Sequence, residues 1–302
     1  MIKLYRVNKD YDSMRIDRWI KKNINNLPQS LIEKLLRIGK IKLNGKKIKS
    51  SQKVFTNDLI KIYKFEFKNV IEKKILIPNK KILKKNESSI IFNNEDIIAI
   101  NKHAGIAVQG GTKSRLNLTD IFTKSKYFDD IKPFTVHRLD KDTSGVLIFG
   151  KNRKAAQTLT SLFRLRKIYK TYICVCLGEI NSNKGEWIHN LEKFENNKKV
   201  IEKAITYYRV LDRNQNYSLV ELKPITGRKH QLRKQLSFLG HPIIGDNKYS
   251  TSNNISKYLM LHSYTLKFKI NNNKFSFKAP LPKHFLEFLV KKKFILPNFL
   301  KN

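Results

Sequence analysis

Acidic residues and cysteines are scarce in this chain of 302 residues. It has 24 Asp and Glu against 62 Lys and Arg, and its only two cysteines are Cys174 and Cys176. Two cysteines are too few for a disulfide framework or a four-ligand zinc site, and their i, i+2 spacing is typical of one face of a strand. We therefore expect both to be buried, reduced packing residues.

Membrane and targeting segments are also missing. The sequence has no run of about eighteen apolar residues, and its N-terminal stretch lacks the charged, apolar and small-residue order of a secretory signal. The motifs GxxxxGKS, GxxxxGKT, GxGxxG and HExxH, which serve nucleotide-driven and zinc chemistry, do not occur. These absences predict a cytoplasmic protein with neither a cofactor nor a metal and with no membrane association.

The excess of basic residues gives a formal net charge of +38 and a pI near 10.1. Each Lys or Arg that neutralises a phosphate releases a condensed counterion, so this excess favours a polyanionic partner such as nucleic acid. Lys is used far more often than Arg, and Asn and Ile are also frequent, as expected of an AT-rich genome. A solvated lysine coat is therefore the alternative explanation for part of the charge.

The pattern of apolar residues predicts two folded units. Residues 14–64 predict two short helices, the second from about Gln29, and then a small hairpin or sheet around the tight turn Asn44-Gly45. Residues 65–88 are rich in lysine and have little periodicity, which is typical of a linker. Two ranges follow: an α+β domain at 89–290 and a C-terminal tail at 291–302.

Within the second unit, four segments have a clear pattern. Ala156 to Phe163 have the apolar spacing of a helix, and KTYICVCLG at 170–178 and SLVELKP at 218–224 have that of strands. Thr226 is placed to cap a helix that begins near Arg228 and ends at Gly240. Residues 259–280 predict a hairpin that turns at Asn271-Asn272-Asn273.

The most informative segment is VHRLDKDTSG at 136–145, because no structural element requires this mixture of residues. It closely resembles the signature of the RluA-like family of pseudouridine synthases, which convert uridine in RNA to its carbon-linked isomer with one aspartate. Three further segments match this family in the same order: KTY at 170–172, LKPITGRKHQLR at 222–233 and GHPIIGDNKY at 240–249.

The resemblance implies an architecture and a substrate. It implies an α+β pseudouridine synthase fold with a mixed, mainly antiparallel central sheet. The N-terminal pattern resembles the small alpha-L type RNA-binding module of the fourth small-subunit ribosomal protein. That domain order, with AVQGG at 107–111, is similar to family members that act on large-subunit ribosomal RNA.

The resemblance also assigns three catalytic residues. Asp140 would attack the ribose, by covalent addition or by proton abstraction, and one carboxylate is enough because the departing uracil anion is stabilised by resonance. Burial would raise the pKa of this carboxyl, so it needs a cation, and Arg228 is the matching arginine. Tyr172 matches the tyrosine that packs against uracil and is implicated in removing the proton from carbon 5. From the residues alone, Asp140 could instead be a loop aspartate, Arg228 a phosphate ligand and Tyr172 a core residue.

Further basic residues are candidates for RNA contact. Arg138 would hold the opened RNA, with a structural salt bridge as the alternative, and His137 would orient the loop. Arg233 cannot share the helix face of Leu232 and Leu236, so we expect it to face solvent or RNA. In the first unit the RNA-binding candidates are Arg15, Arg18, Arg37 and Lys40.

These observations predict a monomeric isomerase that forms pseudouridine in large-subunit ribosomal RNA, free or in an assembling subunit, without an obligate protein partner. Two alternatives are a non-catalytic RNA-binding factor in ribosome assembly and a pseudouridine synthase for transfer RNA. Retention of Asp140, Arg228 and Tyr172 argues against a protein that has lost catalysis.

Overall fold

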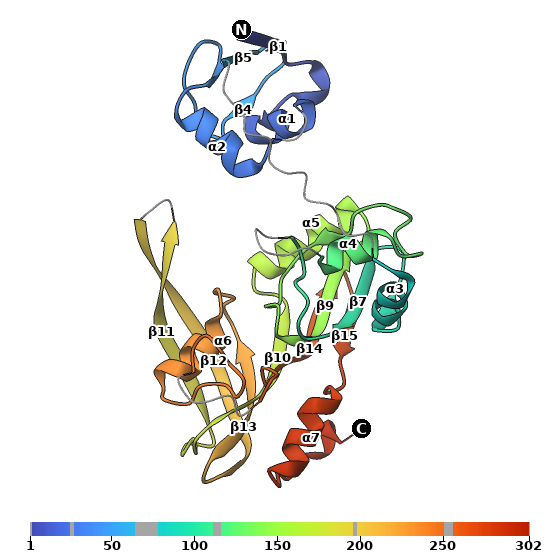
Figure 1. The fold of residues 1–302 in the computed structure, drawn as a ribbon, viewed down its shortest axis with the longest axis vertical. Helices are drawn as coiled ribbons and strands as arrows, with labels where there is room; N and C mark the ends of the chain where they lie inside the picture. The colour runs from blue at the N-terminus through green and yellow to red at the C-terminus, as the bar shows by residue number, and fades with distance from the viewer. Residues whose placement is uncertain are drawn as a thin grey trace. The chain divides into compact units, whose positions relative to one another are not determined.

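The structure, a computed structural model, describes residues 2–24, 27–63, 78–110, 116–195, 198–250 and 256–301. They form two compact units, Met1–Lys73 and Lys74–Asn302, each with its own hydrophobic core (Figure 1). Most of the predicted linker at 65–88 lies outside the described residues. Its C-terminal part does not: residues 80–87 form a helix that belongs to the second unit.

The first unit packs two short helices against a small antiparallel sheet in the order β1-β5-β3. Its elements are β1 (Ile2–Arg6), η1 (Lys9–Tyr11), β2 (Met14–Arg15), α1 (Ile16–Asn23), α2 (Gln29–Arg37), β3 (Ile41–Leu43), β4 (Lys53–Val54) and β5 (Leu59–Tyr63). The two predicted helices are confirmed, and so is the turn at Asn44-Gly45, where both residues have positive φ. The predicted boundary at residue 14 is wrong, because β1 pairs along its whole length with β5.

The second unit is built on a ten-stranded sheet with helices on both sides. Its elements are α3 (Lys80–Glu87), β6 (Ile90–Asn93), β7 (Ile97–Lys102), α4 (Leu118–Thr123), β8 (Phe134–Thr135), β9 (Ser144–Gly150), α5 (Arg153–Arg164), β10 (Tyr169–Leu177), β11 (Lys184–Glu195), β12 (Lys198–Asn214), β13 (Tyr217–Pro224), α6 (Gln231–Phe238), β14 (Leu261–Ile270), β15 (Asn273–Lys278), α7 (Lys283–Lys291) and η2 (Asn298–Leu300).

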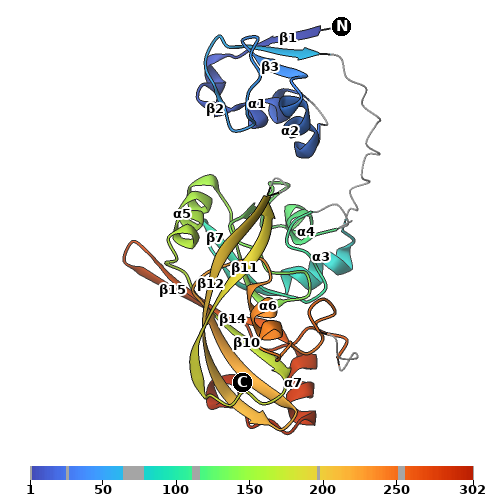
Figure 2. The same ribbon diagram turned by 90° about the vertical axis from the view of Figure 1, so that its left-hand side faces the viewer.

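The sheet runs in the order β11-β12-β13-β10-β14-β9-β7-β6, with β15 added to β14 and β8 to β9. All these pairs are antiparallel except β14 with β9. The predicted mixed, mainly antiparallel sheet is therefore confirmed. Figures 1 and 2 show α6 beside the long β11–β12 hairpin and α5 at the other half of the sheet.

The two halves of the sheet are joined through a very short contact between β14 and β9. Only His262 with Ser144 and Ser263 with Gly145 are in register there. Gly145 has φ +108°, and a Cβ at this position would lie 2.1 Å from the carbonyl oxygen of Ser263. The junction thus requires glycine, both for its backbone angle and for the close approach of the neighbouring strand.

Several local predictions for the second unit are confirmed. The helix α5 spans the predicted apolar stripe and is capped by Asn152, whose side chain accepts the N–H of Ala155 at 2.9 Å. Strands β10 and β13 and the hairpin β14–β15 also form as predicted. Cys174 and Cys176 are buried and free in β10, where burial raises the pKa of both thiols.

Two predictions are wrong at the ends of elements. The helix expected near Arg228 begins at Gln231, because the preceding residue, His230, has a left-handed backbone (φ +54°) that turns the chain. The predicted tail at 291–302 is part of the fold: Phe294 and Leu300 are buried in the same core as α7. In the part of the chain that the structure describes, no helix combines the length and the apolar character needed to cross a membrane.

The junction at Gly145 gives a stability prediction. Gly145→Ala should lower the free energy of unfolding by about 3 kcal/mol, because the methyl group overlaps the Ser263 backbone and the φ value is strained for alanine. Denaturant unfolding measures the difference. Gly227→Ala is the matched control, since its Cβ would meet only the Lys170 Nζ at 4.0 Å, and a change within about 0.5 kcal/mol is expected. Equal stability of the two variants would contradict this account of the junction.

Candidate active site

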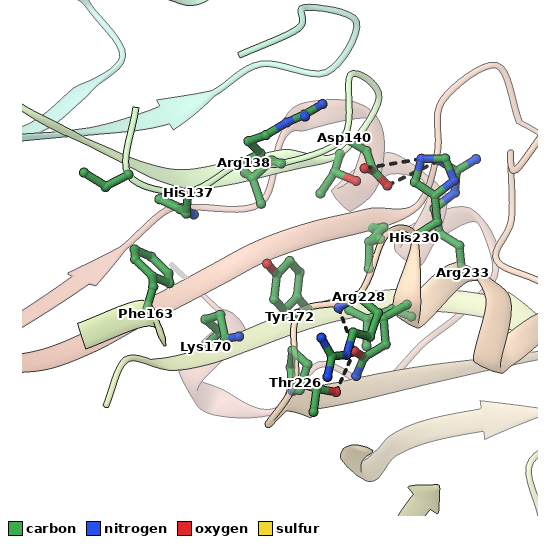
Figure 3. A pocket seen from close by; sticks show the side chains of 18 of the residues that line it. His137, Arg138, Asp140, Phe163, Lys170, Tyr172, Thr226, Arg228, His230 and Arg233 are labelled. Carbon is green, nitrogen blue, oxygen red and sulfur yellow. Dashed lines mark hydrogen bonds and ion pairs between the residues drawn. The ribbon is translucent and has the colours of Figure 1, made fainter. Parts of the chain in front are cut away.

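A cavity of about 510 Å³ lies among the Asp140 loop, strand β10 and the start of α6. Three segments line it: the loop from Thr135 to Asp140, strand β10 at Lys170 and Tyr172, and the segment from Pro224 to Arg233 that leads into α6 (Figure 3). The volume lies within the range of small-molecule sites. Asp140 and Tyr172 therefore face one cavity, as expected for the residues assigned to ribose and base.

Asp140 lies in the loop between β8 and β9, and its side chain is 30 % exposed. Its two carboxylate oxygens face two different partners on α6 and its cap (Figure 3). Oδ2 is 3.4 Å from an NH1 donor of Arg233, and Oδ1 is 3.6 Å from Nε2 of His230. The carboxylate is thus paired with a cation while one side stays open to the cavity.

Arg233, and not Arg228, is the cation beside Asp140. The Arg233 side chain is 9 % exposed and donates from Nε and NH2 to the two carboxylate oxygens of Asp246, both at 2.7 Å. Burial alone would lower its pKa, but the bonds to Asp246 and the charge of Asp140 raise it. The expectation that Arg233 faces solvent or RNA is wrong, because the segment at 246–249 covers the second face of α6.

Arg228 lines the same cavity but pairs elsewhere. Its NH1 donates to Glu202 Oε1 at 2.9 Å and its Nε to the carbonyl of Lys203 at 3.2 Å, both on β12. The predicted ion pair between Arg228 and Asp140 is therefore wrong. Because α6 starts at Gln231, Arg228 precedes the bend at His230 and lies against β12 and not beside the aspartate.

His230 connects Asp140 to a tyrosine of the segment after α6. Its Nδ1 lies 2.7 Å from the Tyr249 hydroxyl, and its Nε2 faces Asp140. Burial lowers the pKa of His230, although the charge of Asp140 opposes the shift, so the ring is neutral at pH 7. A neutral ring can donate to Asp140 only from Nε2, which leaves Nδ1 to accept from Tyr249.

Lys102 supports the Asp140 loop from below. Its side chain is buried, and Nζ donates to the carbonyls of His103, Lys141 and Thr143 at 3.0, 2.9 and 2.7 Å. Burial lowers its pKa to about 7, although the charges of Asp142 and Asp140 oppose this. The turn that follows His103 is held by a bond from the Gly105 N–H to the Lys141 carbonyl at 2.9 Å.

Tyr172 and Lys170 point from β10 toward the cavity (Figure 3). Burial raises the pKa of Tyr172 to about 12, opposed by a hydrogen bond with Ser263, so the phenol is neutral at pH 7. Burial lowers the pKa of Lys170 to about 8, and the charge of Arg166 adds to this. The sequence prediction gave no role to Lys170, although KTY places it two residues before the tyrosine on the same face of the strand.

His137 and Arg138 differ sharply although they are neighbours. The His137 ring stacks on Phe163 with centroids 4.6 Å apart, and its Nε2 accepts the N–H of Ile148 at 2.9 Å. Burial lowers its pKa to about 3, so it is a neutral residue that fixes the loop to β9. Arg138 is exposed at the cavity, and among the described residues its guanidinium has no carboxylate partner.

The basic candidates of the first unit all lie on its surface. Arg18, Arg37 and Lys40 are exposed, whereas Arg15 is held by a 2.7 Å ion pair with Asp17. Their contact with RNA stays a prediction. Two residues that the sequence reasoning missed, Asp246 and Tyr249, lie in the matching segment GHPIIGDNKY, so the motif was visible but its spatial partner was not. The described residues include no group of three or more His, Cys, Asp or Glu side chains suited to a metal ion.

Comparison with known proteins shows that the chain is similar to pseudouridine synthases. The model of the family described as RNA pseudouridylate synthase matches residues 96–238. A ribosomal large subunit pseudouridine synthase C of Rickettsia bellii is 37 % identical over 295 residues, covering 90 % of this chain and 95 % of the relative. A ribosomal large subunit pseudouridine synthase D of Borreliella burgdorferi is 35 % identical over 310 residues, covering 95 % and 93 %.

A solved structure is also similar. Human RNA pseudouridylate synthase domain containing 4 superposes with a TM-score of 0.63 at 26 % identity, covering 72 % of this chain and 98 % of the human chain. Because these relatives are 37 % and 35 % identical and match 90 % and 95 % of the sequence, the chain belongs to the RNA pseudouridylate synthase family.

Proposed function

We propose that the protein is an isomerase that converts uridines of large-subunit ribosomal RNA to pseudouridine, with Asp140 as its catalytic carboxylate. The carrying observation is the Asp140 carboxylate, open to a cavity of about 510 Å³ that Tyr172 also lines and paired with the buried Arg233. The names of the relatives support ribosomal RNA as the substrate. We also propose that the protein acts as a monomer in the cytoplasm and needs no protein partner.

The reaction breaks the bond between ribose C1′ and uracil N1 and forms one between C1′ and C5. The proton on C5 is lost and N1 gains one, so no atom is added or removed overall. Asp140 supplies the negative charge, either by adding to the ribose or by taking a proton from it. Arg233 donates a hydrogen bond to one oxygen of the carboxylate and His230 lies 3.6 Å from the other, so the two side chains fix its orientation before the substrate binds.

Tyr172 is better suited to pack its ring against the uracil than to act as a general base. With a pKa of about 12, its hydroxyl stays protonated at neutral pH. In this neutral form the phenol cannot serve as the base for the C5 proton, because it would first have to lose its own proton. We propose that Tyr172 packs against the uracil and that Arg228, which lines the same cavity, contacts the base or its phosphate.

Replacing the catalytic carboxylate tests the proposal directly. Asp140→Asn keeps the shape of the side chain but removes its charge, so pseudouridine formation on unmodified ribosomal RNA should fall at least about 10³-fold. Chemical mapping of pseudouridine measures this. Asp129→Asn is the matched control, since Asp129 is exposed and does not line the cavity, and it should keep activity within about threefold.

Three outcomes separate the readings of the sequence. No pseudouridine with the wild-type protein on ribosomal or transfer RNA would reject the enzyme and favour the assembly factor. Product on transfer RNA alone would reject the substrate but keep the reaction. Full activity of Asp140→Asn would reject Asp140 as the catalytic group.

The Tyr249–His230 pair gives a pH prediction. The pKa of His230 is lowered, so its ring is neutral at pH 7 and takes a proton only below its ordinary value of about 6.5. The added proton occupies Nδ1 and ends the bond from Tyr249, so we expect wild-type kcat to decrease in that acidic range. His230→Gln can still donate to Asp140 but cannot titrate, so it should lose about tenfold in kcat and lose this inflection as well.

The pH profile of single-turnover rates distinguishes this positioning role from a purely structural one. Tyr249→Phe should lower kcat about threefold to tenfold with little change in KM, because only the bond to His230 is lost. His241→Gln replaces a histidine that bonds the Leu177 carbonyl and should leave the profile unchanged. An unaltered acidic inflection in His230→Gln would contradict the assignment.

We propose that the first unit binds structured RNA through the exposed faces of α1 and α2 and the residues after them. Helical spacing places Arg18 and Lys22 on one exposed side of α1, with Arg37 and Lys40 exposed at the end of α2. Cations held in a rigid arrangement can follow a folded RNA backbone by the position of its phosphates. Tethering such a unit raises the effective concentration of the catalytic unit near its uridines.

Deletion of residues 1–73 tests this role, because the second unit has its own cores. Affinity for ribosomal RNA should fall at least about tenfold, while the single-turnover rate at saturating RNA stays within about threefold of wild type. Filter binding and rapid-quench assays measure the two quantities. Equal affinity of the full and shortened proteins would refute an RNA-binding role for the first unit.

A further inference from the structure

A second cavity, of about 610 Å³, lies on the other side of Asp140 from the first. Its walls come from residues 104–109, from the Asp140 loop and from the segments at 245–248 and 257–259. Both cavities share six lining residues, which are Gln109, Arg138, Leu139, Asp140, His230 and Arg233. The catalytic carboxylate and its two partners thus form a partition between two adjoining chambers, and only the first contains Tyr172.

The partition constrains how an RNA chain can lie. If the target base occupies the chamber of Tyr172, its ribose must lie at Asp140, where C1′ reacts. The phosphodiester chain continues from that same ribose, and the second chamber is the adjoining space. Its volume, like that of the first, is in the range of a site for one small ligand.

The charge of the second chamber suits a phosphate. Arg138, Lys141, Lys248 and Lys257 are all exposed and line it. Within the described part of the chain, none of these four side chains forms an ion pair with a carboxylate. Lys248 lies over the Tyr249 ring at 5.4 Å. Two carboxylates line this chamber, Asp140 and Asp142, and of these Arg233 pairs only with Asp140.

An aromatic ring completes the second chamber. Tyr258 is 43 % exposed and lines it, and one face of its ring is stacked on His284 with centroids 4.2 Å apart. Stacking from behind holds the ring in place while its exposed part faces the chamber. Nucleic-acid bases stack on such aromatic platforms without regard to sequence, and the amides of Asn247 and Gln109 offer polar groups for base edges.

We propose that the second chamber is a subsite for the nucleotide that adjoins the target uridine, with Lys248 and Lys257 at its phosphate and Tyr258 against its base. The proposal rests on the proposed function, because it takes RNA as the substrate and Asp140 as the reacting group. It assigns two lysines and a tyrosine that contact the substrate outside the uracil pocket. The subsite contributes to RNA affinity and to the choice of uridine by its neighbour.

A double variant, Lys248→Gln with Lys257→Gln, tests the phosphate contacts. KM for ribosomal RNA should rise about tenfold while the single-turnover rate at saturating RNA stays within about twofold. The slope of log affinity against log salt should become shallower by about 1.4, as expected for two lost contacts to single-stranded RNA. Tyr258→Leu should raise KM about tenfold without changing the salt slope.

The matched control is Lys269→Gln with Lys274→Gln, a cross-strand pair of lysines on the β14–β15 hairpin that lines neither chamber. It removes the same charge and should leave KM and salt slope within about twofold and about 0.3 of wild type. Equal effects of the two double variants would overturn the proposal in favour of a general effect of net charge. Unchanged RNA affinity in the Lys248 and Lys257 variant would overturn it too, and would point to a different partner such as an acidic protein segment.

The binding measurement also separates this proposal from the function itself. Repeated in an Asp140→Asn background, it needs no turnover and reports on the subsite alone. A wild-type protein without activity but with the predicted loss of affinity in the double variant would reject the isomerase and keep the subsite. An active wild-type protein whose double variant binds RNA with unchanged affinity would reject the subsite and keep the isomerase.

Discussion

The buried guanidinium of Arg233 holds this site together, because it lies between two carboxylates with different tasks. Asp246 is fully buried and occupies two donors of Arg233; burial would raise its pKa, but Arg233 and the backbone N–H groups of Lys248 and Tyr249 lower it. A donor of NH1 faces Asp140, whose side chain is 30 % exposed. Removing one partner of a buried ion pair costs about 3 to 5 kcal/mol, so this triad is held by its mutual charge balance. The structural carboxylate therefore fixes the arginine, and the arginine fixes the catalytic carboxylate.

The backbone around the triad is held by contacts from distant parts of the chain. Lys102 at the end of β7 binds two carbonyls of the loop that carries Asp140, and Gly145 just after that loop joins β9 to β14. His230 adopts a left-handed conformation at the start of α6, which turns its ring toward Asp140. A left-handed backbone at a residue other than glycine persists where surrounding contacts over-determine the geometry, as the bond to Tyr249 and the contact with Asp140 do for His230.

The sequence predicted which segments form the site but not which side chains pair within it. Asp140 and Tyr172 could be assigned because each lies in a short motif of neighbouring residues, Asp140 in VHRLDKDTSG and Tyr172 in KTY. The choice between Arg228 and Arg233 depended on where α6 begins. Helix propensities do not predict the left-handed backbone of His230, which delays the start of the helix to Gln231. Asp246 and Lys102 escaped notice for a related reason, since a buried charge is recognised by the partner that the fold brings to it. Helix α3 and the buried end at Leu300 were hidden by lysine-rich sequence, where the apolar signal is diluted.

The cations around Asp140 differ in their bonding partners: some bond within the protein, and others lack a carboxylate partner. Arg233 and Lys102 are buried, and their bonds to Asp246, to Asp140 and to three backbone carbonyls fix the site from within the protein. Arg138, Lys248 and Lys257 surround the same aspartate from the solvent side and lack carboxylate partners in the described residues. A polyanion approaching this surface meets exposed cations whose neutralisation releases counterions, and these offset the repulsion between its phosphates and the Asp140 carboxylate. The buried Arg233 faces the same carboxylate from within the protein, so Asp140 lies between one internal cation and several exposed ones.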